Sequence, residues 1–179
     1  MIKICWVFPN LKLMEFDKLK IKMVLGLFTL AILTRLLPHP PNFAPITSIA
    51  LFSGFYFENK RFAILFPLVC MLVTDIYLGL HSLMPVIYGC FVINTYIGIK
   101  FKKLTFTSIL LASFSFFIVS NLGVWFFHYP QTFSGLLTCF TLAIPFFLNS
   151  LAGDLFYSSI LDISVKKLSQ PSFFIVEGN

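Results

Sequence analysis

Long apolar runs alternate along the chain with short polar or proline-rich breaks. A helix rises about 1.5 Å per residue, so a run of about 20 apolar residues spans the ~30 Å hydrocarbon core of a bilayer. The runs predict helices at residues 21–37, 44–57, 62–80, 82–99, 105–127 and 134–163. We therefore expect an all-α fold, a polytopic membrane bundle of about six transmembrane helices.

Two of these runs have unusual lengths. The run at 44–57 is short for a complete crossing and could form a half-helix. The run at 134–163 is too long for one crossing, and within it Pro145 lacks the N–H that a helix interior needs. We expect Pro145 to divide this run into an outer, partly re-entrant piece and a sixth helix from about residue 145 to residue 163.

The composition leaves too little polar surface to coat a soluble core, because 58% of the residues are hydrophobic and only 11% are charged. One membrane domain at residues 21–165 is expected, with a basic cytoplasmic segment at 1–20 and a cytoplasmic tail at 166–179. All basic residues except Arg35 fall before or at the start of the first run or in every second connection after it. They are Lys3, Lys12, Lys18, Lys20, Lys22, Lys60, Arg61, Lys100, Lys102, Lys103, Lys166 and Lys167. The positive-inside rule then places both termini in the cytoplasm.

Apart from Lys22 and Asp162, which stand at the ends of their runs, three charged residues lie inside the apolar runs, where a charge costs about 2.5–3.5 kcal/mol on insertion scales. Arg35, near the outer end of the first run, could reach outer headgroups or pair with an acid. Asp75 and Asp154 lie in the third and sixth spans. One arginine against two aspartates leaves a surplus acid, which must be protonated, hydrated, or matched by a bound cation or amine. The alternative for each aspartate is that it only joins helices through hydrogen bonds.

Polar side chains share a face on two of the later helices. Asn121, Trp125 and His128 follow at steps of four and three, which places them on one helix face near the outer surface. Ser150, Asp154 and Tyr157 repeat this spacing. The two faces could meet around a small pocket that opens outward, although Trp125 could instead anchor its helix at the membrane interface.

The first outer connection, residues 38–45, carries four prolines and is therefore stiff, as a lid or fixed cap would be. Small residues at 50–54 would allow close helix approach. The candidate ligand-binding residues are His39, Asn42, Asp75, Asn121, Trp125, His128, Asn149 and Asp154, with Arg35 as a structural ion-pair residue.

The sequence lacks the motifs of the common catalytic and cofactor sites. It has no Gly-rich phosphate loop, no histidine pair at metal spacing and no serine or cysteine nucleophile motif. Its four cysteines are scattered, without zinc or redox spacing. We predict neither an enzyme nor a bound cofactor or metal, and we expect the bilayer and a small molecule, not nucleic acid, as partners.

Several segments together resemble an uncharacterised bacterial membrane-protein family that is distantly similar to the substrate-binding S components of energy-coupling-factor vitamin transporters. They lie at residues 35–45, 50–54, 74–75, 120–125, 129–132, 135–136, 144–147 and 153–155. The resemblance implies a bacterial inner-membrane protein that captures a small molecule from the outer side, with a transmembrane coupling protein and cytoplasmic ATPases as partners. The first helix departs from the S-component pattern, because residues 26–31 lack the alanine-x-x-x-alanine docking motif.

The predicted function is small-molecule binding in an uptake transporter or sensor. The alternative is a non-transporting structural subunit of a membrane complex.

Overall fold

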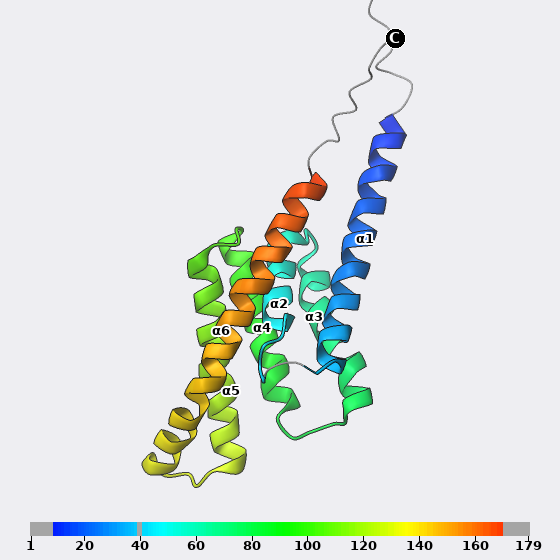
Figure 1. Ribbon diagram of the computed structural model, residues 1–179. Coiled ribbons are helices and arrows are strands. Elements are labelled where there is room, and N and C mark those ends of the chain that lie inside the picture. The colour runs from blue at the N-terminus through cyan, green and yellow to red at the C-terminus, as the bar shows by residue number, and fades with distance from the viewer. Residues whose placement is uncertain (1–8, 39–40, 170–179) are drawn as a thin grey trace, which may run out of the picture.

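The computed structural model describes residues 9–38 and 41–169, and in them it shows six helices and no strand. The helices are α1 (Pro9–Leu36), α2 (Ile46–Tyr56), α3 (Lys60–Leu78), α4 (Met84–Phe101), α5 (Phe106–His128) and α6 (Phe133–Ser169). They form one bundle whose connections alternate between its two ends, with the start of α1 and the end of α6 at the same end (Figure 1). The expected all-α bundle is confirmed.

The helix ends agree with the apolar pattern except in the first and last helices. Helices α2 to α5 begin and end within two residues of the predicted bounds, whereas α1 begins at Pro9 instead of residue 21. The predicted division at Pro145 is wrong, because α6 is continuous from Phe133 to Ser169. Phe117 of α5 contacts Phe140 before the proline and Phe147 after it, at centroid distances of 5.5 and 4.8 Å. Packing on both sides therefore offsets the one backbone hydrogen bond that a proline removes.

Helix α2 is the centre of the bundle. Its 11 residues give a length of only about 16 Å, roughly half of a bilayer core. Every residue from Ile46 to Gly54 is buried, and α2 packs against all the other helices. It is therefore a half-helix that is surrounded by protein, as its short apolar run allowed.

A close crossing joins α2 to α4. A Cβ atom added to Gly54 would lie 2.0 Å from the carbonyl oxygen of Thr95, and one added to Gly98 would lie 2.1 Å from the carbonyl oxygen of Leu51. The two backbones thus touch where each helix has a glycine. Close approach through the small residues at 50–54 agrees with the expectation from the sequence.

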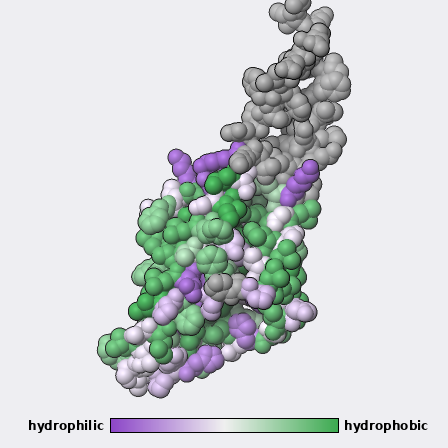
Figure 2. All heavy atoms as spheres, in the orientation of Figure 1, coloured by the Kyte–Doolittle hydropathy of each residue, from purple (hydrophilic) through white to green (hydrophobic). Residues whose placement is uncertain are grey.

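The outer surface of the bundle is apolar. By length and composition, α3, α4, α5 and α6 could each cross a membrane, and α2 is a shorter apolar helix. Large hydrophobic side chains remain exposed along them, including Phe133 at 80% and Ile76 at 70% of their full area. Hydrophobic side chains cover much of the face shown in Figure 2. Apolar surface on this scale indicates insertion into a membrane, because soluble proteins rarely expose it.

Candidate ligand-binding site

Arg35 and Asp75 form an ion pair that fastens α1 to α3. The Arg35 Nη2 donates to Asp75 Oδ1 at 2.6 Å, and its Nη1 contacts the sulfur of Met71. Tyr88 of α4 donates its hydroxyl to Asp75 Oδ2 at 2.8 Å. Asp75 is 1% exposed, and both of its carboxylate oxygens have partners. Of the two alternatives expected for Arg35, the structure shows the ion pair with an acid. The carboxylate of Asp75 contacts side chains of α1 and α4 and so joins helices.

Asp154 is the second buried acid, and it lies at a junction of α2, α5 and α6. It is 2% exposed. Ser113 of α5 lies with its hydroxyl 2.6 Å from Asp154 Oδ2, and the hydroxyl of Ser48, in the first turn of α2, lies 3.4 Å from Oδ1. The described part of the chain places no basic side chain within ion-pair distance of this carboxylate. Asp154 is therefore the surplus acid.

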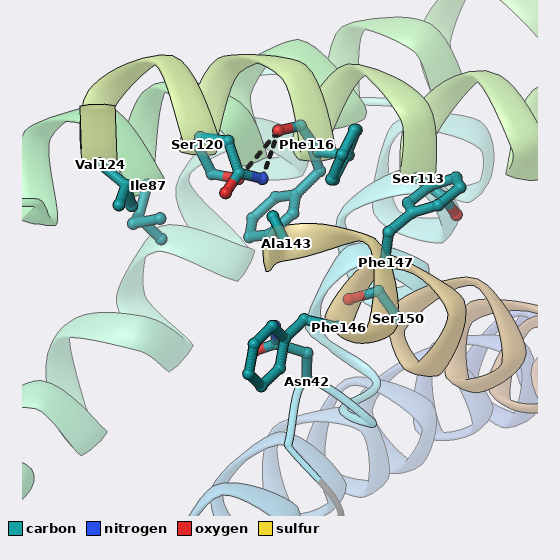
Figure 3. Close-up of a pocket in the computed structure, with 12 residues that line it drawn as sticks. Asn42, Ile87, Ser113, Phe116, Ser120, Val124, Ala143, Phe146, Phe147 and Ser150 are labelled. Atoms are coloured by element: carbon teal, nitrogen blue, oxygen red, sulfur yellow. Dashed lines mark hydrogen bonds between the residues drawn. The ribbon is translucent and has the colours of Figure 1, made fainter. Parts of the chain in front are cut away.

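A cavity of about 200 Å³ lies between α5 and α6, against the connection from α1 to α2. Its lining includes the polar side chains of Asn42, Ser113, Ser120, Asn121 and Ser150. The remaining lining residues are apolar: Ile87, Phe116, Phe117, Val124, Ala143, Phe146 and Phe147. In Figure 3 the α5 side chains lie along one side of the space, and Ser150, Phe146 and Asn42 face them from the other. This mixture of aromatic faces and a few polar groups is typical of small-molecule sites.

The cavity is next to Asp154. Ser113 lines it and also reaches the Asp154 carboxylate. Ser150, another lining residue, precedes Asp154 by four positions on α6 and so shares its helix face. The Asp154 carboxylate therefore lies one helical turn from Ser150 in the cavity wall, and the Ser113 side chain stands between it and the cavity.

The connection from α1 to α2 is fixed against α6. Asn149 donates its side-chain amide to the carbonyl oxygen of Pro41 at 3.2 Å. The ring of Phe43 packs on those of Phe156 and Tyr157, at centroid distances of 5.9 and 5.6 Å. Asn42, between these two contacts, has a φ of 63°, a left-handed conformation that asparagine tolerates better than most residues. The fixed connection holds Asn42 at the cavity.

The other sequence candidates lie apart from the cavity lining. Trp125 donates its indole N–H to the carbonyl oxygen of Pro130 at 3.0 Å and thereby stabilises the turn between α5 and α6. His128, at the end of α5, is exposed. Asn149 holds the connection, as described above, and His39 lies outside the described residues. Among the candidates that the structure describes, only Asn42 and Asn121 line the cavity.

Sequence reasoning missed Ser113 and Ser120. Both lie on the face of α5 that carries Val124, because Ser113, Ser120 and Val124 follow at steps of seven and four, which return to the same side of a helix. Asn121 is one residue beyond Ser120 and so lies about 100° further round the helix, and its own stripe of steps of three and four does not pass through Ser120. No spacing within α2 or α6 indicates that Ser48 meets Asp154, because that contact depends on how the two helices pack.

Comparison with known proteins gives one match. Residues 17–173 match the model of a protein family described as a family of unknown function (DUF6580). No curated protein matches the chain, and no solved structure does. Within the described residues, no group of three or more histidine, cysteine, aspartate or glutamate side chains could hold a metal ion.

Proposed function

We propose a function for the chain from its own geometry, because it belongs to a family, DUF6580, whose function is unknown. The chain is a multi-pass membrane protein that binds a small molecule in the cavity between α5 and α6. The observation that carries this proposal is the cavity of about 200 Å³, with polar groups from two helices and from Asn42. An engineered cavity of about 150 Å³ can hold benzene, so a compound of about one ring fits here.

The ligand enters from the outer side of a bacterial inner membrane, with both termini of the protein in the cytoplasm. The charge distribution supports this orientation. Lys60 and Arg61 begin α3, Lys100 and Lys102 end α4, and these helix ends lie at the same end of the bundle as the start of α1 and the end of α6 (Figure 1). Basic residues favour the cytoplasmic side. The cavity lies against the α1–α2 connection, which is at the opposite end of α1 from Pro9.

The ligand-bound protein acts in uptake, as an S component does, or in sensing. The resemblance stated above supports the first of these, together with the central half-helix and the fixed connection that borders the cavity. Transport also requires a transmembrane coupling protein and ATPases, and the chain itself carries no phosphate-binding loop. The first helix lacks the alanine docking motif, so such a partner would have to contact a different surface.

Gentle purification followed by mass spectrometry of released small molecules tests the proposal. A Ser150→Phe variant should lose the co-purified compound, because the new ring occupies the cavity. The matched control is Ser159→Phe, the same change on the same helix at an exposed position. A protein that never carries a compound, or a Ser150→Phe variant that retains it, would favour a structural subunit instead.

A further inference from the structure

We infer that the ligand of this cavity is a small organic cation, an amine or quaternary ammonium compound of about one ring, with Asp154 as its buried counter-charge. The inference rests on the proposed function and names the chemical class of its ligand. It follows from three observations: the surroundings of Asp154, the absence of a basic partner for it, and the lining of the cavity.

The surroundings of Asp154 suit a carboxylate. The Ser113 hydroxyl lies 2.6 Å from Oδ2, which falls in the range of charge-assisted bonds from a hydroxyl to an ionised oxygen, about 2.5–2.7 Å. Ser48, in the first turn of α2, has its hydroxyl 3.1 Å from the main-chain carbonyl oxygen of Asp154 and 3.4 Å from Oδ1. The N-terminal end of a helix carries partial positive charge and stabilises an anion placed beside it. The Ser113 hydroxyl and a helix end thus favour the ionised form.

The charge of this carboxylate is not neutralised by the described part of the protein. Arg35, the basic residue inside the apolar runs, is already bound to Asp75. The other described ion pair joins Lys166 to Asp162, an exposed pair near the end of α6. A buried charge without a counter-ion is costly, and the cost is relieved either by a proton or by a nearby cation, so a cation close to Asp154 would be favoured.

The cavity is the place where such a cation can lie. Ser113 separates it from Asp154, so a cation touching the Ser113 hydroxyl would be only about 5 Å from the carboxylate, by two hydrogen-bond lengths. Four phenylalanine rings line the space, and aromatic faces attract cations. No lining residue is charged. An anion would therefore meet no basic group and would be repelled by Asp154.

A matched set of one-ring compounds tests the inference: benzylamine, benzyl alcohol and benzoate, which are cationic, neutral and anionic at neutral pH. Binding of each to the detergent-purified protein would be measured by calorimetry. We expect benzylamine to bind at least about tenfold more tightly than benzyl alcohol, a difference of about 1.4 kcal/mol, and benzoate not to bind. Asp154→Asn should remove the preference for the amine and leave the alcohol unaffected.

The control is Asp162→Asn, the same change at an exposed site of the same helix, which should keep the preference. If Asp154→Asn does not fold, the comparison of the three compounds on the unaltered protein decides alone. Equal or tighter binding of benzyl alcohol or benzoate would overturn the inference while leaving the proposed function intact. Failure of all three compounds to bind, together with no co-purifying small molecule, would overturn the proposed function and the inference with it.

Discussion

The glycine crossing between α2 and α4 gives the sharpest test of the fold. In Gly98→Ala, the new methyl group would lie 2.1 Å from the carbonyl oxygen of Leu51 and 3.1 Å from the amide nitrogen of Phe55. The first distance is about 1.3 Å short of the 3.4 Å at which ordinary contact begins. Because both neighbours are backbone atoms of a buried helix, no side chain can turn aside. The two helices must separate.

The magnitude follows from two opposing effects. Overpacking of this kind costs about 1–3 kcal/mol, and the upper part of that range applies where backbone must move. Alanine is the better helix former by about 1 kcal/mol, which offsets part of the loss. We expect a net loss of about 1–2 kcal/mol in the free energy of unfolding. For a chain of this length, that loss lowers the melting temperature by roughly 2–8 °C.

Gly89→Ala is the matched control, since Gly89 lies on the same helix and an added Cβ meets nothing within 4 Å. It should melt at or above the temperature of the unaltered protein, because only the gain in helix propensity remains. Thermal unfolding of the three proteins in one detergent, followed by far-ultraviolet circular dichroism, makes the comparison. If Gly98→Ala melts as high as Gly89→Ala, the close crossing of α2 and α4 is wrong.

Three further predictions concern the ion pair and the topology. Asp75→Ala should lower the free energy of unfolding by about 3–5 kcal/mol, because it leaves Arg35 without its partner. Tyr88→Phe removes only one hydrogen bond and should cost about 1 kcal/mol. Denaturant titrations that rank the two variants the other way would contradict this geometry. Tags at either terminus should be accessible only from the cytoplasm. If a C-terminal tag is labelled from outside intact cells, the prediction of six spans is wrong. Deletion of residues 3–20 should preserve folding, since their sequence has no apolar periodicity to pack against the bundle; failure of the shortened chain to insert would show that the segment is needed.

The helices could be predicted from the sequence because membrane helices depend mainly on local apolar length. The pattern fixed α2 to α5 to within two residues, and the short apolar run at 44–57 correctly allowed a half-helix. Pro145 was misread because its effect depends on neighbours. The Phe117 ring of another helix packs on both sides of the proline, and no rule about one helix contains that information.

The candidate site was predictable only in part, for a related reason. Helical spacing correctly put Asn121 and Ser150 on faces that border one cavity. The same spacing placed Trp125 and His128 on the face of Asn121, but the indole of Trp125 is hydrogen-bonded to the carbonyl oxygen of Pro130 while its neighbour Val124 lines the cavity, and His128 is the last residue of α5. Spacing gives the side of a helix that a residue occupies, whereas the depth of a cavity depends on the neighbouring helices.

The two buried acids illustrate why charge counting from sequence is useful even where contacts cannot be foreseen. One arginine cannot neutralise two aspartates, and the structure assigns Arg35 to Asp75, which also receives the Tyr88 hydroxyl. Asp154 is left with hydroxyl groups and the end of a half-helix, beside a cavity. Loss of the charge at Asp75 should therefore reduce stability, because a partner becomes unpaired. Loss of the charge at Asp154 should mainly change which ligand binds, because no basic side chain of the described residues is paired with it.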